Sequence, residues 1–339
     1  MDSSINQTLE LCKKILKENQ KFIISADLDG ILSALVLQKY LNWQIVGFCD
    51  SKNTVWILPK EKKNFKEIVF IDIFIRNPEI RCIDQHIVCK DHNHSGEMYS
   101  SQTKLNPNIQ NKRYAKRKFK EDEREFRWKY PFGTVHYILA CIETLKIDVK
   151  IENKQSQFNN VKVFDLLLRA DDAAFSTSYK YRRNCKIWWN WLKELGGNFT
   201  TTLADYCLEI KMDEAKKTQD ILKHEFKDLK CKLRSKDANF SNQLVENKGE
   251  IKDETLSLLE KISSSLNFPK LKLENYYEPL VGTYDRIATY REDKIEEVFN
   301  RKDLFSYAFT FYYGPGSMHG FSYTLFPPDG IPNNLHKTI

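Results

Sequence analysis

Carboxylate side chains stand at the ends of four apolar segments of the sequence. The segments and their acids are residues 22–26 before Asp27 and Asp29, 68–71 before Asp72, 80–83 before Asp84, and 161–170 before Asp171 and Asp172. Carboxylates gathered at one sheet edge repel one another, so a purely structural role for all of them is costly. Divalent cations remove that cost, and carboxylate oxygens with an imidazole suit manganese or magnesium. Because two such ions can clamp an in-line displacement at phosphorus, the pattern predicts a metal site for phosphate chemistry.

The strongest local signal is Asp27-Leu28-Asp29-Gly30, which directly follows the apolar residues 22–26. Two carboxylates at this spacing are expected to project into the crevice where a strand gives way to a helix. Gly30 permits the tight turn, and the N-terminus of the helix adds positive potential for a phosphate. A structural alternative is a capped turn in which Asp29 is the N-cap of the helix.

The elements that must position these acids alternate between strand-like and helical patterns. The expected strands are residues 22–26, 44–49, 54–58, 68–73 and 80–83, and the expected helices are residues 9–18, 30–40 and 132–145. This alternation is typical of an α/β fold with a largely parallel sheet. In such sheets ligands bind in the crevice at the carboxyl ends of the strands, where the acids stand.

The length of 339 residues is comfortable for two domains. We expect a metal-binding α/β domain over residues 1–210, a helical connector and linker over 211–253, and a smaller α/β domain over 254–339. The polar, weakly patterned stretch 235–253 is the best linker. Ligands commonly bind between domains, so the cleft between the two is the expected active site.

Composition narrows the class of protein. The formal net charge of +7 favours an anionic partner such as a nucleotide or nucleic acid. The eight cysteines are scattered without a CxxC pair, which indicates reduced thiols. Apolar runs are too short to span a bilayer, and the first 20 residues lack the pattern of a secretory signal. We therefore expect a cytoplasmic protein without a membrane partner.

The order and spacing of these motifs resemble the DHH phosphoesterase superfamily, which includes RecJ-type exonucleases, nanoRNases, cyclic-dinucleotide phosphodiesterases and family II pyrophosphatases. Asp27-Leu28-Asp29-Gly30 is similar to the first motif of that family and Asp72 to the second, and Asp84-Gln85-His86 stands in place of the DHH triplet. Asn106-Pro107-Asn108 and Phe132-Gly133-Thr134 are similar to the segments that follow, and Asp171 or Asp172 to the fourth motif. The resemblance covers about residues 20–185.

The resemblance implies one or two Mn²⁺ or Mg²⁺ ions and a role for each matched residue. Asp27 would bind one ion and Asp29 the other, Asp72 would bridge them, and Asp171 (alternatively Asp172) would complete the second site, with Gln85 as a weaker ligand. Asp84 and His86 would be catalytic, since Asp84 would orient neighbouring ligands and His86 would contact the substrate phosphate. A water activated by the cations would attack phosphorus.

Further residues are expected to contact the substrate. Asn106 belongs to the segment after the triplet, and Arg182 and Arg183 come shortly after the fourth motif. A glycine-rich loop near the C-terminus, similar to the substrate-gripping loop of the family's C-terminal domain, contributes Gly314, Gly316, Ser317 and His319. An ordinary hairpin turn is the alternative for this loop. The implied partners are nucleotides, oligonucleotides or single-stranded nucleic acid, and a homodimer is left open.

The implied function is a divalent-metal-dependent phosphodiesterase that hydrolyses short oligonucleotides, single-stranded nucleic-acid ends or cyclic nucleotides. Two departures weaken the metal site, because Ser25 stands where many family members have a histidine and Gln85 replaces the first histidine of the triplet. The first alternative is therefore a catalytically degenerate nucleotide-binding sensor or scaffold protein. A HAD-type phosphatase, whose nucleophile motif also fits residues 27–30, comes third because it leaves Asp72 and residues 84–86 unexplained.

Overall fold

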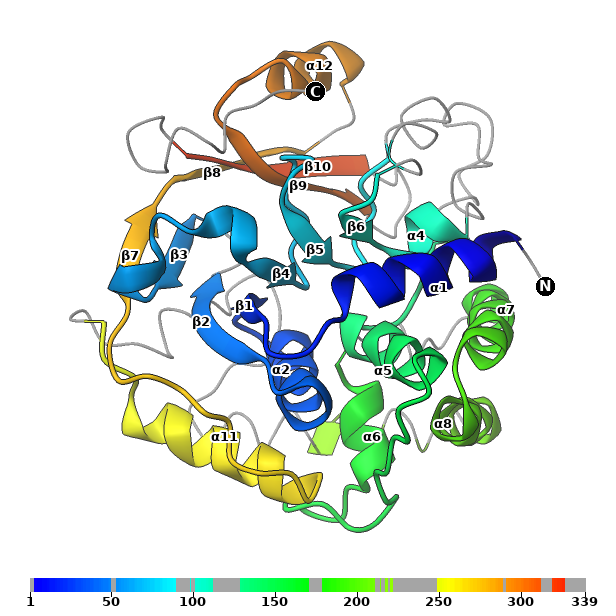
Figure 1. Ribbon diagram of the computed structural model, residues 1–339. Coiled ribbons are helices and arrows are strands. Elements are labelled where there is room, and N and C mark those ends of the chain that lie inside the picture. The colour runs from blue at the N-terminus through cyan, green and yellow to red at the C-terminus, as the bar shows by residue number, and fades with distance from the viewer. Residues whose placement is uncertain are drawn as a thin grey trace.

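The computed structural model describes most of the chain. The described residues are 3–49, 53–89, 98, 101–111, 129–170, 179–210, 214, 217–218, 220–221, 249–288, 291–311 and 319–326. They form two sheets, one large and one small, with helices packed on both (Figure 1).

The large sheet has seven strands in the order β6-β5-β4-β1-β2-β3-β7. Their bounds are β1 Lys21–Ser25, β2 Gln44–Cys49, β3 Thr54–Ile57, β4 Val69–Ile71, β5 Arg81–Ile83, β6 Lys104–Leu105 and β7 Glu278–Val281. The strands from β6 to β2 are parallel to one another, and β3 runs antiparallel to both β2 and β7. The prediction of an α/β fold with a largely parallel sheet is confirmed.

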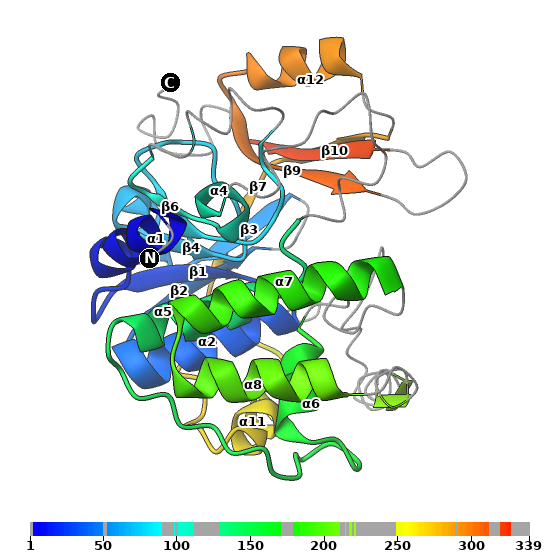
Figure 2. The ribbon, with the colours of Figure 1, turned by 90° about the vertical axis from the view of Figure 1, so that its right-hand side faces the viewer.

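Helices of the first 210 residues pack on the large sheet and on one another. They are α1 Ser3–Ile15, α2 Leu28–Leu41, α4 Pro107–Gln110, α5 Thr134–Thr144, α6 Val163–Leu168, α7 Tyr179–Leu195 and α8 Asn198–Glu209, with the 3-10 turns η1 Pro59–Glu61 and η2 Phe65–Glu67 between β3 and β4. Helix α5 is buried along residues 134–142, because it packs against α2, α1, α7 and α8. Figure 2 shows α7 and α8 as the outer layer of this side. The N-terminus of α5 is thereby fixed beside the sheet.

The small sheet consists of β8 Thr283–Ile287, β9 Leu304–Phe311 and β10 His319–Leu325, all antiparallel in the order β8-β10-β9. Helix α12, Glu292–Phe299, lies on its outer side (Figure 1). The small sheet stands over the large one and is joined to it through two isolated bridges, Ile75 to Ser306 and Ile87 to Phe309.

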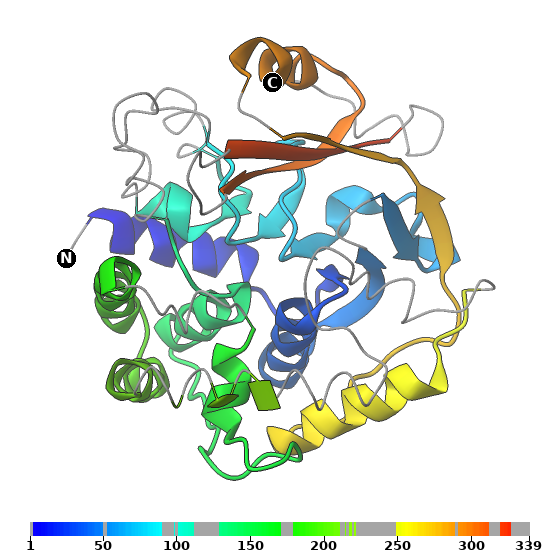
Figure 3. The ribbon, with the colours of Figure 1, turned by 180° about the vertical axis from the view of Figure 1, so that it is seen from behind.

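The part of the chain after residue 253 contributes to both sheets. Helix α11, Asp253–Ser265, packs against α2, and β7 extends the large sheet by pairing with β3 (Figure 3, yellow and gold). The boundary that we predicted at residue 254 thus precedes two elements that lie on the large sheet. The small sheet begins at Thr283. Among the described helices, none has both the length and the apolar character needed to cross a membrane.

Candidate metal centre and its cleft

Strand β1 lies at the point where the winding of the large sheet reverses. The chain passes from β1 through α2 to β2 on one side and later continues in β4 on the other side of β1. In open α/β sheets ligands bind outside the carboxyl ends of the strands at such a switch point. Asp27, Asp72 and Asp84 follow the carboxyl ends of β1, β4 and β5, so the sequence pattern and the topology select the same edge.

Asp27 is the N-cap of α2. One of its carboxylate oxygens accepts a hydrogen bond from the backbone N–H of Gly30 at 3.0 Å, and the other accepts from Ser25 Oγ at 2.9 Å. The N-cap is therefore Asp27 and not Asp29, the residue considered in the structural alternative. A Cβ atom at Gly30 would lie 1.9 Å from the Ser25 carbonyl oxygen, so only glycine fits this turn.

Asp29 is buried and points to the N-terminus of α5. Its carboxylate accepts hydrogen bonds from the backbone N–H groups of Thr134 at 2.6 Å and Val135 at 2.9 Å. A Cβ atom at Gly133 would lie 2.8 Å from either oxygen, which explains the glycine that precedes α5. Both oxygens of Asp29 are thus engaged by a helix terminus, which stabilises a negative charge there.

Asp72 is the most constrained of the acids. Its φ of 60° lies in the left-handed region, which is uncommon for a residue other than glycine, and its side chain is buried. Oδ1 accepts a hydrogen bond from Thr134 Oγ1 at 2.7 Å. Burial, followed by the charges of Asp29, Asp27 and Asp84, raises the pKa of Asp72 well above its ordinary value of 3.8. A nearby cation would reverse this cost.

Asp84 and His86 form a hydrogen-bonded pair. Asp84 is fully buried and accepts hydrogen bonds from His86 Nδ1 at 2.6 Å, from the His86 backbone N–H at 3.1 Å and from Asn106 Nδ2 at 3.0 Å. Both Asp84 oxygens are engaged in this way, which fixes the plane of the imidazole ring. His86 itself is partly exposed and lines the cleft described below.

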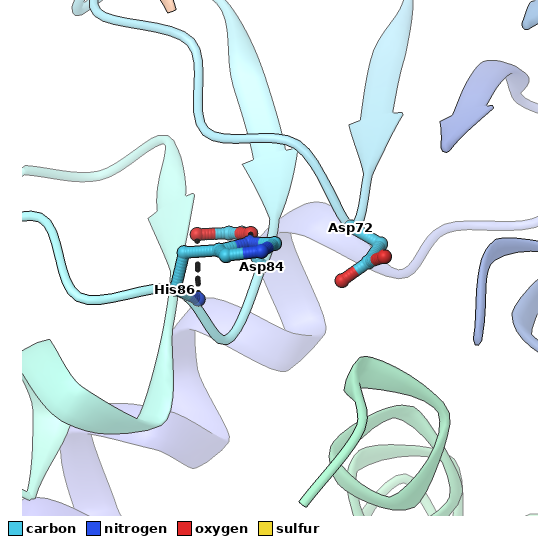
Figure 4. Close-up of side chains that lie close together, drawn as sticks. All are labelled: Asp72, Asp84 and His86. Carbon is cyan, nitrogen blue, oxygen red and sulfur yellow. Dashed lines mark hydrogen bonds and ion pairs between the residues drawn. The ribbon is translucent and has the colours of Figure 1, made fainter. Parts of the chain in front are cut away.

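Asp72, Asp84 and His86 together could hold a metal ion. Each offers one ligand atom, and these atoms lie within 4.8 Å of one another (Figure 4). The figure shows the Asp84–His86 pair beside Asp72, which comes from the neighbouring strand end. Since both oxygens of Asp84 already accept hydrogen bonds, Asp72 and His86 are the members of this group with more freedom to bind an ion.

A cleft of about 240 Å³ opens between these residues and the small sheet. Its lining comes from both sheets: Ser25, Asp27, Cys49, Asn53, Thr54, Val55, Asp72, Ile73, Phe74 and His86 on one side, and Tyr284, Phe305, Ser306, Tyr307, Ala308, Ser322, Tyr323, Thr324 and Phe326 on the other. The acids at the switch point therefore face a wall supplied by residues more than 190 positions later in the chain.

Three of the residues predicted to contact substrate or metal have other partners. Asn106 is fully buried, and its amide donates to Asp84 and to the His86 carbonyl oxygen, so it supports the Asp84–His86 pair from behind. Arg182 donates from its guanidinium to the carbonyl oxygens of Leu208 and Ile210 at the end of α8. For Gln85, the described contact is through its backbone carbonyl oxygen, which accepts from Asn108 Nδ2 at 2.8 Å.

The remaining predicted residues are placed only in part. Arg183 is exposed on α7 and is not among the residues that line the cleft. Asp171, Asp172, Gly314, Gly316 and Ser317 lie outside the described residues, as does the side chain of His319, whose backbone begins β10.

Sequence reasoning missed two groups of residues at the site. Thr134 and Asn108 stand in segments recognised as motifs, but their hydrogen bonds to Asp72 and to the residue after Asp84 depend on how α5 and α4 pack. The cleft residues of the small sheet, such as Ser306, Ser322 and Thr324, follow a simple alternation along two strands and carry no motif.

No family model, no curated protein and no solved structure matches this chain.

Proposed function

We propose that this chain is a divalent-metal-dependent phosphodiesterase that hydrolyses short oligonucleotides, single-stranded nucleic-acid ends or cyclic nucleotides. The observation that carries the proposal is the convergence of Asp27, Asp72 and His86, from three separate strand ends, on one cleft at the switch point of the sheet. Asp29 and Asp84 add negative charge within reach of Asp72. Such a concentration of carboxylates at a cleft is typical of a cation site.

The residues present fit one cation better than two. Asp27 and Asp72 line the cleft and would hold Mn²⁺ or Mg²⁺, with the His86 ring close by, whereas Asp29 is turned to α5 and is not among the described residues that line the cleft. The raised pKa of Asp72 supports this fit, because a buried carboxylate among other acids gains most from a positive charge. When bound, the cation would lower the pKa of a nearby water and offset charge on phosphate oxygens.

The protein's own residues would orient the reaction. Asp84, supported by Asn106, holds the His86 imidazole in one orientation at the cleft, where it would donate a hydrogen bond to a phosphate oxygen. Thr134 orients the carboxylate of Asp72 through a 2.7 Å hydrogen bond. Ile73 and Phe74 give the cleft an apolar border beside Asp72, which would strengthen electrostatic interactions there.

Hydrolysis of a mixed panel tests the proposal. The panel consists of labelled single-stranded DNA, a dinucleotide, cyclic dinucleotides and pyrophosphate, each incubated with Mn²⁺ and with the wild type, Asp72→Asn or Asp27→Asn. Since a cation contributes several kcal/mol to the transition state, we expect cleavage of a nucleotide substrate that falls at least about a hundredfold in either variant. Asp148→Asn is the matched control, because this exposed acid forms an ion pair with Lys150 and is not among the described residues that line the cleft. Equal rates in the wild type and Asp72→Asn would contradict the proposal.

A second function, nucleotide binding without hydrolysis, is favoured by the engagement of Asp29. If its oxygens stay with Thr134 and Val135, a second cation lacks one carboxylate, and Ser25 and Gln85 supply no imidazole in compensation. Under this alternative the wild type binds nucleotides but cleaves none of the panel. Introducing Ser25→His and Gln85→His together would then create activity.

A further inference from the structure

Several hydroxyl-bearing residues that line the cleft lie on one face of the small sheet. Residues paired across an antiparallel sheet share a face, and Thr324 pairs with Ser306 on one side and with Tyr284 on the other. Ser322 lies two positions before Thr324 along β10 and therefore on the same face. All four line the cleft. We call Ser306, Ser322 and Thr324 the hydroxyl wall.

The opposite face of the small sheet is aromatic and packs on α12. The ring of Phe299 lies 4.8 Å from that of Tyr307 and 5.5 Å from that of Phe321, measured between centroids. Phe305 and Tyr307 reach the cleft along β9, where they pack against Phe70 and Phe74 of the large-sheet unit. The hydroxyl wall is therefore the polar side of a two-faced sheet, and it lines the cleft together with aromatic residues of the other face.

The hydroxyl groups of the wall match a ligand group that can donate a hydrogen bond to them. The Ser322 hydroxyl donates to the Ala308 carbonyl oxygen at 3.3 Å, which leaves its lone pairs to accept a hydrogen bond from a ligand. A phosphate diester has no hydrogen to donate, whereas a sugar hydroxyl has one. Arg286 pairs with Ser322 on the face of the wall, but neither it nor any other described lysine or arginine is among the residues that line the cleft. The wall therefore matches the neutral, hydroxyl-bearing part of a ligand, and the phosphate belongs at the acids and His86.

The size of the cleft and its rim point to a single nucleoside unit. A volume of about 240 Å³ is smaller than the roughly 300–1,000 Å³ of pockets for drug-sized ligands. Tyr284, at the end of the row Ser306–Thr324–Tyr284, is 37% exposed and offers a ring on which a base could stack. In an internal nucleotide of a chain both the 3′ and 5′ oxygens are esterified, so the 2′-hydroxyl of ribose is the sugar's hydrogen-bond donor.

We propose that the hydroxyl wall binds the ribose of a nucleotide through its 2′-hydroxyl, so that the site selects ribonucleotides over deoxyribonucleotides. The placement of the phosphate at the acids rests on the proposed function. Ser322 and Thr324 are then the residues that determine specificity for the sugar.

The test compares the binding of the dinucleotides pApA and d(pApA) by calorimetry, with Ca²⁺ in place of Mn²⁺ to separate binding from hydrolysis. We expect the wild type to bind pApA about tenfold more tightly, the effect of one net hydrogen bond. Ser322→Ala and Thr324→Val should reduce this ratio to about one to two, chiefly by weakening pApA. Thr283→Val is the matched control, since Thr283 pairs with Leu325 on the other face and should leave the ratio unchanged.

The outcomes separate this inference from the proposed hydrolysis. Equal affinity of the wild type for both dinucleotides would overturn the inference, as would a ratio that survives in both variants. Binding of neither dinucleotide would also overturn it, even if another member of the hydrolysis panel is cleaved. A ribose preference that depends on Ser322 and Thr324 supports the inference even in a chain that cleaves nothing in Mn²⁺.

Discussion

At the residue scale, Asp72 combines features that oppose folding when no cation is present. Its carboxylate is buried, it lies near Asp29, Asp27 and Asp84, and its backbone has a left-handed φ. A residue under such constraints persists when the surrounding structure holds it, which is common at functional sites. Thr134 and the Asp72 N–H bond to the Ile83 carbonyl oxygen hold it here.

Asp72→Asn is expected to stabilise the metal-free protein at neutral pH. The folded pKa of Asp72 is raised above its ordinary value of 3.8, so the protonated carboxyl is favoured by folding and the ionised one is not. Stability contributed by this group is therefore present below pH 3.8 and lost as the pH rises through the raised folded pKa, by up to about 1.4 kcal/mol per pH unit. Urea unfolding of EDTA-treated wild type and variant at several pH values measures the difference. The prediction is contradicted if the difference in the free energy of unfolding between variant and wild type does not grow as the pH rises above 3.8.

Several acids of the site were predictable from sequence because strand ends in a parallel sheet share one edge. Asp27, Asp72 and Asp84 each follow a short apolar run, and β1, β4 and β5 bring them together. The orientation of Asp29 was not predictable, since it depends on where α5 begins in space, 105 residues later. Asn106 illustrates the same limit, because its motif was visible but its burial behind Asp84 was not.

At the element scale, the N-terminus of α5 is tied to the site through two acids. Asp29 caps the helix through backbone N–H groups, and Thr134 at its first position holds Asp72. The position of this helix and the geometry of the acids are consequently coupled.

Gly133→Ala tests this coupling. The added Cβ would lie 2.8 Å from the Asp29 carboxylate, which cannot retreat without losing its hydrogen bonds to α5. We expect a loss of about 1–3 kcal/mol in the free energy of unfolding. Asp29→Ala removes the cap and should cost about 0.5–2 kcal/mol. Because both changes damage one contact, the double variant should lose less than their sum. Strict additivity in urea unfolding would show that the two residues act independently.

Arg76 ties the small sheet to the loop that begins at Asp72. Its guanidinium donates to the carbonyl oxygens of Phe299 and Arg301 at the end of α12, and its backbone N–H donates to the Phe305 carbonyl oxygen. Ile75 forms a bridge with Ser306 in the same place. These contacts hold β9, which supplies part of the cleft lining, next to the loop that begins at Asp72.

Arg76→Met should loosen the small sheet locally, because hydrogen bonds to a charged group contribute about 1.5–3 kcal/mol each. We expect faster amide hydrogen exchange over residues 291–311, with little change in the core of the large sheet. Arg291→Met, at the other end of α12, is the control, since this exposed arginine pairs with Asp293. If amide hydrogen exchange over residues 291–311 is unchanged in Arg76→Met, Arg76 does not stabilise the small sheet.

At the scale of the whole molecule, the alternation of strands and helices predicted the α/β class and most element positions. The expected strand 22–26 corresponds to β1, and the expected helix 132–145 to α5. The directions in which the strands pair were harder to predict from the sequence. We expected β3 within a largely parallel sheet, but it runs antiparallel to β2. The return of the chain through α11 and β7 to the large sheet rests on contacts between distant segments, which a local pattern does not encode.

The central claim is that the acids at the switch point bind a divalent cation, and direct measurement of Mn²⁺ binding tests it. Calorimetric titration of EDTA-stripped protein should give one strong site per chain in the wild type and Asp148→Asn. Affinity should fall by at least about tenfold in Asp72→Asn and Asp27→Asn, as expected when a charged ligand is lost. Wild-type protein that binds no Mn²⁺, or Asp72→Asn that binds it as tightly as the wild type, would contradict the claim.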